Sequence, residues 1–598
     1  MKCYLFLFIC LLCISRQVVL GATTTIYVAP SSTNTDPNCG GSIDNSCASI
    51  QDAIASFKAT NPVASGSPAI YPPLVVALLS GTYYSSATSK NAGVTIDINQ
   101  YDITIQPASD TASVTILGNN FANTMFVIGT TPEKCASKLT LNNLSFDQWT
   151  QKIIGVSSLN SFIATISGCT FTNSPGPTKG MNPYVISIFG YGGVNKLNLD
   201  KCTISSNSAP SASSFIYTQG VTTTVTGTTF EKNTITFIST SGSSQVTLSN
   251  SDFLANQQIV SMNNGNLTVN GCEFDNNQGS SSIIAGKNTG MSIINTNFIS
   301  NSLSSSQGSV IYNSGANDNY FNVSGSKFNS NIGTPVYSLS NVLGVKGTTF
   351  QNNQGYYGGG IYQSQTSVDI SSSIFIVSSS GNSLSEMIYL NKVPLLSLSS
   401  SNFKITNDAT GVSSTFAMIE CQDSSIYLNS ITMDLANYRS MDCTSCQVVL
   451  KSGNDYKCTD PPATTGANTN TGTSTSTGTS TSTSTGTSTG PSTGPSTGPS
   501  TGPSSTSSTS STSSSTSGST SGSGTSGGRT VTTSSSTSTS TSSTTGTSNN
   551  GEPKGEIWKI AVGIVVAFLV IGAIGIIIFV VMRRKSHKHG VYTPLMRT

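Results

Sequence analysis

Two acidic residues in the sequence are spaced so that their carboxylates could act together. Asp252 and Glu273 each stand one position before a phenylalanine, in successive copies of a repeated pattern. If the copies stack at the spacing of neighbouring β-strands, the carboxylates would lie about 5 Å apart, which suits a retaining glycosidase. In the other copies this position is mostly Ser, Thr or Asn, which is typical of an ordinary solvent-facing column. We favour the second interpretation: Asp252 and Glu273 are the only catalytic candidates, and we predict that the chain is not an enzyme.

A second column of candidate residues is aromatic and consists of tyrosines that each follow an Ile or Val, namely Tyr312, Tyr337, Tyr362 and Tyr389. If the preceding aliphatic side chain points inward, the four rings stand outward on consecutive copies. Such rings could bind the flat faces of sugars or a partner chain. The alternative, which we favour, is that a ladder of like residues stabilises the sheet.

The cysteines predict disulfide bonds. Three of the 13 (Cys3, Cys10 and Cys13) fall within the first 22 residues, which leaves ten, and an even number in an exported chain favours pairing. We expect Cys39 to pair with Cys47, whereas Cys169 and Cys202 either form a bridge or remain buried thiols. Four more candidates lie near the end of the repeats: Cys421, Cys443, Cys446 and Cys458.

Neither a metal ion nor a cofactor is predicted. Cys443-x-x-Cys446 could suggest zinc, but both histidines, His587 and His589, lie in the last twelve residues of the chain. An exported protein also meets an oxidising compartment, which favours disulfides over a zinc site.

Short strands must position these residues. From Phe146 to Met433 a large apolar residue, usually Phe, recurs about every 26 residues. Most copies read apolar-x-apolar, then Gly or Asn, then small-x-Phe, followed by a second polar turn with Asn and a third short strand. Three short strands per copy predict an all-β parallel β-helix, in which each coil contacts only its neighbours. An antiparallel β-sandwich is the rival, but it gives no reason for the regular phenylalanine.

The first segments resemble the opening of pectin-lyase-like right-handed parallel β-helix proteins: Ile26–Val28, Cys47–Ile54, Val75–Tyr83 and Asp102–Ile105. The resemblance implies a capping helix near Ile50 to Phe57. The Phe-x-x-Asn copies and residues 350–361 are similar to the repeats of polymorphic outer-membrane proteins, and the Ser/Thr usage resembles that of social-amoeba type I membrane β-helix proteins. Polyuronide-cleaving enzymes of this fold use several Asp and a His, or an Arg base with Ca²⁺, whereas this region has no His and only Arg439. The resemblance therefore implies a fold and no activity.

The two ends of the chain predict a type I membrane protein. A short apolar run after Lys2 is typical of a signal peptide, with an uncleaved anchor as the alternative. Ile560 to Met582 carry no charge and would span about 35 Å as a helix, and Arg583-Arg584-Lys585 place the following tail in the cytoplasm. The predicted segments are a signal peptide (1–22), the N-terminal cap and first coils (23–138), the β-helix repeats with a Cys-rich cap (139–458), a disordered Ser/Thr/Gly/Pro-rich stalk (459–557), a transmembrane helix (558–582) and a cytoplasmic tail (583–598).

The composition and several short motifs indicate which partners and modifications the chain could have. Only 9% of residues are charged and the net charge is +2, which argues against a nucleic-acid partner. The stalk is either O-glycosylated or an unmodified linker. Tyr592 and Leu595 form a possible sorting signal for a cytoplasmic adaptor, with a plain stop-transfer tail as the alternative. Three Asn-x-Ser/Thr sequons predict N-glycosylation, at Asn143, Asn266 and Asn322.

We therefore predict a single-pass glycoprotein of the plasma membrane that presents its β-helix outside the cell for adhesion or recognition. Its partner would be an extracellular glycan or a surface protein. The alternatives are a membrane-tethered polysaccharide-degrading enzyme, either a glycosidase or a lyase, and a purely structural coat protein.

Overall fold

A computed structural model describes residues 23–451 and Cys458, apart from short internal segments. Those segments are 63–70, 85–93, 97–101, 119–123, 129–136, 151, 159–160, 175–183, 192–193, 209–213, 316–318, 379–385, 407–415 and 435–438. The predicted signal peptide, stalk, transmembrane helix, tail and sorting signal lie outside the described residues. Among the described residues, no helix is both long and apolar enough to cross a membrane.

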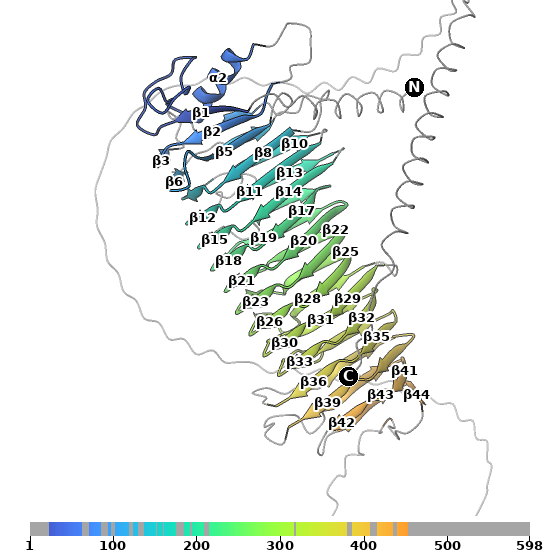
Figure 1. Ribbon diagram of the computed structural model, residues 1–598. Coiled ribbons are helices and arrows are strands. Elements are labelled where there is room, and N and C mark those ends of the chain that lie inside the picture. Colours follow the sequence, from blue (N-terminus) through green and yellow to red (C-terminus); the bar gives the residue numbers. More distant parts are fainter. Residues whose placement is uncertain are drawn as a thin grey trace, which may run out of the picture. The chain divides into compact units, whose positions relative to one another are not determined.

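Each coil of the chain contributes three short strands, and coil follows coil from the α2 end to the β44 end (Figure 1). The first set, the tyrosine row, comprises β4 (Val94–Ile96), β7 (Phe126–Ile128), β10 (Ile154–Ser158), β13 (Tyr184–Gly190), β16 (Ser214–Gln219), β19 (Thr236–Ser241), the first halves of β22 (Val260–Asn270) and β25 (Ser282–Ile294), β28 (Ser309–Ser314), β31 (Thr334–Leu339), β34 (Ile361–Ser364), β37 (Glu386–Asn391), β40 (Ala417–Gln422) and β43 (Arg439–Thr444).

The second set, the middle row, continues the same 28-stranded sheet. It comprises β1 (Thr24–Val28), β2 (Leu74–Leu78), β5 (Ile103–Pro107), β8 (Ser137–Asn142), β11 (Phe162–Ser167), β14 (Asn195–Asp200), β17 (Thr222–Thr226), β20 (Ser244–Ser249), the second halves of β22 and β25, β29 (Tyr320–Ser324), β32 (Val342–Lys346), β35 (Val368–Ser371), β38 (Leu396–Ser399), β41 (Ser425–Asn429) and β44 (Gln447–Lys451).

The third set, the phenylalanine row, forms a 14-stranded sheet of its own. It comprises β3 (Gly81–Tyr84), β6 (Val114–Leu117), β9 (Ser145–Asp147), β12 (Thr170–Thr172), β15 (Thr203–Ser205), β18 (Thr229–Glu231), β21 (Asp252–Leu254), β23 (Glu273–Asp275), β26 (Asn297–Ile299), β30 (Lys327–Asn329), β33 (Thr349–Gln351), β36 (Ile374–Val377), β39 (Asn402–Ile405) and β42 (Thr432–Asp434). A small sheet pairs β24 (Gln278–Gly279) with β27 (Ser302–Leu303).

Every strand pairing between described residues is parallel, for example β21 with β23 and β23 with β26. The prediction of a parallel β-helix is therefore confirmed, and the antiparallel sandwich is excluded. The recurring phenylalanines align in register and lie inside the coils, with Ile204 and Met433 filling the same column at two positions. Neighbouring rings stack, as Phe298 does on Phe274 at 4.8 Å and on Phe328 at 4.7 Å between ring centroids.

The bend between the middle row and the phenylalanine row explains the Gly or Asn of the repeat. In each coil from β8 to β42 one residue there adopts a left-handed backbone, with φ between 47° and 64°. Glycine and asparagine tolerate this region better than other residues do. The bend lets both flanking strands keep one face inward, as the pattern predicts. The left-handed residues are Asn143, Gly168, Lys201, Gly227, Asn250, Gly271, Asn295, Gly325, Gly347, Ser372, Ser400 and Ser430.

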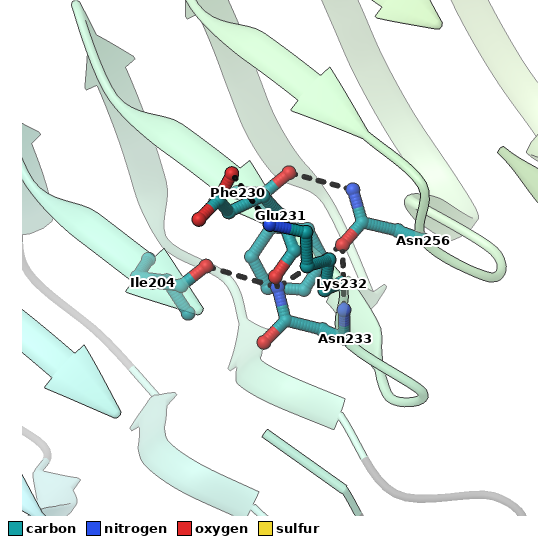
Figure 2. A network of polar contacts seen from close by, with 6 residues as sticks. All are labelled: Ile204, Phe230, Glu231, Lys232, Asn233 and Asn256. Atoms are coloured by element: carbon teal, nitrogen blue, oxygen red, sulfur yellow. Dashed lines mark hydrogen bonds and ion pairs between the residues drawn. The ribbon is translucent and has the colours of Figure 1, made fainter. Parts of the chain in front are cut away.

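A second repeated asparagine lies after the phenylalanine row, and here the structure adds to the sequence analysis. The pattern suggests a polar surface turn, yet these residues are buried and form a ladder: Asn207, Asn233, Asn256, Asn277, Asn301, Asn331 and Asn353. Figure 2 shows one step, in which the side-chain amide of Asn233 donates to the carbonyl oxygen of Ile204 (2.9 Å) and to Oδ1 of Asn256 (3.0 Å). The backbone N–H of Asn233 donates to the same Oδ1 at 2.9 Å. Each side chain thus satisfies buried polar groups of both neighbouring coils.

The N-terminal end is covered by the predicted capping helix, α2 (Ile50–Thr60), which packs against β1 and β2. The hydroxyl of Ser49 caps α2 by accepting from the backbone N–H of Asp52. The Cys39–Cys47 disulfide, predicted from the sequence, is present.

The C-terminal end carries two disulfides, Cys421–Cys446 and Cys443–Cys458, so the predicted cluster of four cysteines is confirmed and its pairing is defined. Cys169 and Cys202 are free thiols, which corrects the possible bridge between them. Both are buried, and burial raises the pKa of Cys169 to about 12 and that of Cys202 to about 11. Protonated thiols of this kind act as small apolar core residues.

Candidate functional site

The predicted tyrosine column exists as a stacked ladder on the outer face of the tyrosine row. Tyr312, Tyr337, Tyr362 and Tyr389 pair in register on β28, β31, β34 and β37, and the Ile or Val before each ring is buried. Their ring centroids are 5.3, 4.2 and 5.4 Å apart along the ladder, with interplanar angles of 24°, 8° and 11°. We call these four residues the tyrosine ladder.

Stacking covers the ring faces inside the ladder. Tyr337 and Tyr362 each have a neighbouring ring on both sides, and Tyr362 is only 7% exposed. Burial, reinforced by the neighbouring tyrosines, raises the pKa of Tyr337 well above its ordinary value. A flat sugar cannot reach the faces of these two rings. The ladder therefore contributes to the stability of the sheet, which is the role that we favour for it from the sequence.

Two further tyrosines join the ladder from the loop between β33 and β34. The ring of Tyr357 meets Tyr337 edge-on at 5.8 Å and Tyr362 at 5.0 Å between centroids. Tyr356 stands perpendicular to Tyr357, 4.7 Å away, and is 60% exposed. These two residues lie outside the repeated Ile-Tyr and Val-Tyr pattern, although Tyr-Tyr-Gly-Gly-Gly at 356–360 departs visibly from the other repeats. We call the ladder and this pair together the tyrosine cluster.

An acidic group continues the outward column beyond the ladder. Tyr389 pairs in register with Glu420, which pairs in register with Asp442. Glu386, at the start of β37, is only 1% exposed, and its Oε2 has no hydrogen-bond partner. Burial first, and the charge of Glu420 second, raise the pKa of Glu386 to about 8. The sequence did not single out this group, because an acidic residue on a strand gives no sign of whether it is buried.

The candidate carboxylates Asp252 and Glu273 lie side by side in register on β21 and β23, on the outer face of the phenylalanine row. Asp252 is exposed and Glu273 half-buried, and the next residue of the column is Asn297. Their predicted adjacency is therefore present, but they lie on a different sheet from the tyrosine cluster. Across the described residues, no three His, Cys, Asp or Glu side chains are grouped so that they could bind a metal ion.

All three sequon asparagines are exposed, and each faces a glycine on the following coil. Asn266 pairs with Gly290 and Asn322 with Gly344, both in the middle row. A Cβ atom at Gly290 would lie 2.6 Å from Oδ1 of Asn266, and one at Gly344 would lie 2.7 Å from Oδ1 of Asn322. The glycines thus leave room beside the two side-chain amides.

A cavity of about 330 Å³ lies in the first coils, away from the tyrosine cluster and from Asp252. Among the predicted site residues only Asn143 lines it, and Asp110 is its one charged side chain. The other lining residues are Gln106, Pro107, Ser109, Ala112, Asn142 and Ser167. This lining offers hydroxyl, amide and carboxylate groups for hydrogen bonds.

Comparison with known proteins agrees with this architecture. Residues 133–298 match the family model described as a right-handed beta helix region, which defines the fold as a right-handed parallel β-helix. No curated protein matches the chain.

Several solved structures are similar in fold. They include the surface adhesin PfbA of Streptococcus pneumoniae (13% identity, TM-score 0.31, covering 67% of this chain and 95% of that chain) and the periplasmic alginate epimerase AlgG (12%, 0.23, 68% and 83%). A rhamnogalacturonan lyase is also similar (10%, 0.25, 65% and 84%). Likenesses at these scores carry no argument about activity or ligand.

Proposed function

We propose that the β-helix is a recognition module that binds an extracellular glycan or a surface protein through the tyrosine cluster. The supporting observation is Tyr356, a 60% exposed ring supported by Tyr357 and the stacked ladder beneath it. Tyrosines that are held rigidly bind at a low cost in conformational entropy, and their phenol groups also form hydrogen bonds. The neutral, hydroxyl-rich chain favours an uncharged glycan as the ligand.

We also propose that this module is displayed outside the cell, with 1–22 as a signal peptide, 459–557 as a stalk and 558–582 as a membrane span. Three disulfides support an oxidising compartment, where such bonds form and persist. The uncharged run from Ile560 to Met582 and the basic residues after it support a single span with the tail inside.

Replacing Tyr356 by alanine is expected to weaken ligand binding about tenfold or more without unfolding the protein, because an exposed aromatic anchor contributes binding energy and little packing. The full-length chain would be screened on a glycan array and on cells, and the dissociation constant of a hit compared between variants. Tyr320→Ala is the matched control, since Tyr320 is 67% exposed on β29 and lies outside the cluster. Equal affinities for Y356A, Y320A and the unaltered chain would refute the proposed surface.

The enzyme alternative rests on the adjacency of Asp252 and Glu273. The same preparations would be incubated with wall and matrix polysaccharides and assayed for reducing ends. Turnover that disappears in Asp252→Asn or Glu273→Gln would replace recognition by hydrolysis as the function. Absence of any saturable ligand would favour the structural coat protein.

Passage through the secretory pathway predicts N-linked glycans at the exposed sequons. In a eukaryotic secretory host, Asn266→Gln should remove the mass of one glycan, because Gly290 leaves its amide accessible. Asn263→Gln is the control, since Asn263 is exposed on the same strand but belongs to no sequon. Mass spectrometry before and after N-glycosidase treatment measures the change. A chain that carries no N-glycan at Asn143, Asn266 or Asn322 would contradict the proposed location.

A further inference from the structure

The acidic group beside the tyrosine ladder joins two neighbouring coils at the C-terminal end. Glu386 lies three residues before Tyr389 on β37. Glu420 lies on the next strand of the row, β40, where it pairs in register with Tyr389. The register places the carboxyl groups of Glu386 and Glu420 beside each other, in a position where they can form a hydrogen bond. Two carboxyl groups can form such a bond only when one of them carries a proton, because carboxylates only accept.

The same cross-coil contact occurs elsewhere in the tyrosine row without charge. Ser214 on β16 and Ser239 on β19 are hydrogen-bonded at 2.6 Å, and Tyr184 on β13 stacks on Tyr217 on β16 at 4.5 Å. These pairs occupy the same two register positions as Glu386 and Glu420. Among the described coils, only the pair Glu386 and Glu420 places a carboxyl group at both of these positions.

Among the described residues, no salt bridge joins Glu386 or Glu420 to a positive charge. On β43, Asp442 lies in register with Glu420, and its charge opposes ionisation of that residue. Arg439, also on β43, is 3.6 Å from Asp442 and pairs with it. The remaining titratable neighbours are the phenols of Tyr389 on β37, Tyr362 on β34 and Tyr357 in the preceding loop, and burial raises the pKa of Tyr389 and of Tyr357.

We propose that Glu386 and Glu420 share one proton and act as a pH-sensitive latch, which holds the last coils together while the proton is bound and loosens them when it is lost to solvent. Loss of the proton breaks the hydrogen bond and leaves two carboxylates side by side, one of them almost fully buried. Separating them requires β40 to move away from β37. Cys421 is the residue after Glu420 on β40, and Cys443 is the residue after Asp442 on β43. The movement would therefore reach both C-terminal disulfides.

The direction of the pH effect follows from the environment of Glu386. Its pKa is raised by burial from an ordinary 4.5 to about 8, so the folded state favours the protonated form. The stabilisation is therefore complete below about pH 4.5 and is lost as the pH rises through about 8. Within this window, opening should become about tenfold more frequent for each pH unit. The latch goes beyond the recognition proposal and does not depend on it.

Hydrogen–deuterium exchange of the full-length chain tests the latch. We expect the amides of β37 and β40, after correction for the intrinsic pH dependence of exchange, to lose about a hundredfold or more of their protection between pH 5 and pH 8. The amides of β21 and β23 serve as an internal reference and should show no such loss. In Glu386→Gln, a neutral amide can donate to Glu420 at every pH, so the protection should become independent of pH.

Glu273→Gln is the matched control, because it removes an outward carboxyl of the phenylalanine row and should leave the pH dependence of β37 and β40 unchanged. If E386Q fails to fold, Glu420→Gln provides the same neutral partner from the other side of the pair. Equal protection of β37 and β40 at pH 5 and pH 8 in the unaltered chain would overturn the latch. A pH dependence that persists in both E386Q and E420Q would overturn it as well.

Discussion

Replacing Asn277 by alanine is expected to destabilise the centre of the β-helix by about 3–5 kcal/mol. The side chain is fully buried and makes four hydrogen bonds to its neighbours. Its Oδ1 accepts from the backbone N–H and from the side-chain amide of Asn256, at 2.9 and 3.2 Å. Its amide donates to the carbonyl oxygen of Phe253 at 2.8 Å and to Oδ1 of Asn301 at 2.9 Å.

The large effect comes from the groups that the substitution leaves behind. The backbone N–H of Asn256 would remain buried without an acceptor, which costs about 1–3 kcal/mol, and the carbonyl of Phe253 would lose one of its donors. The cavity left by the amide is narrow and lies between coils, so water can replace the lost bonds only if the coils separate. The asparagine ladder is therefore a continuous structure, and one missing step affects the coils on both sides.

Hydrogen exchange in β23 and β26 would measure the change as a free energy of local opening, which suits a repeat protein better than a single midpoint of unfolding. Asn270→Ala is the control, because Asn270 is exposed at the end of β22. We expect N270A to change stability by no more than about 0.5 kcal/mol. Similar losses for N277A and N270A would mean that the ladder contributes no more than a surface asparagine does.

The features that repeat could be predicted from the sequence, because each recurs with a fixed spacing. The phenylalanine column, the left-handed bend and the outward tyrosines follow from one apolar position, one Gly or Asn and one Ile-Tyr or Val-Tyr per coil. The cap helix and the Cys39–Cys47 disulfide also follow, because these two cysteines are close in the chain, whereas the pairing of the four C-terminal cysteines does not. In these cases the partner in space is the equivalent residue of the next copy, or a near neighbour in sequence.

The features that occur once could not be predicted. Cys169 and Cys202 share a column, but whether they form a disulfide depends on the directions of their side chains. The spacing of the repeats in the sequence does not determine those directions. The position of Tyr357 depends on a loop that folds back over the ladder. The contact of Glu386 with Glu420 joins two residues that are not paired in the register of β37 and β40. The asparagine ladder is an intermediate case: its period is visible, but a polar residue after a strand indicates a surface turn until the next coil supplies its partner.

Replacing Phe298 by alanine is expected to cost about 3–5 kcal/mol, the usual range for deleting a buried phenyl ring. Phe298 is fully buried and stacks between Phe274 and Phe328, so the substitution removes two ring contacts and leaves a cavity. Coils on both sides are fixed by their strand hydrogen bonds at the spacing of the sheet, which prevents the cavity from collapsing.

Phe298→Leu separates volume from aromatic stacking. The column already contains Ile204 and Met433 in register with its phenylalanines, so an aliphatic side chain is compatible with this position. We expect F298L to lose less than about half as much as F298A, since it refills most of the space and forfeits only the ring contacts. Ile374→Ala, at a 39% exposed position of the same row, is the control and should lose little.

Local opening free energies from hydrogen exchange in β23, β26 and β30 would report all three variants. If F298L is as damaging as F298A, ring stacking and not volume limits the choice of residue, and Ile204 and Met433 must then mark weak points of the helix. Because each coil rests only on its neighbours, the loss in F298A should decline with distance from β26. Equal loss of protection in β12 and β39 would contradict this one-dimensional picture and indicate that the β-helix opens as a single unit.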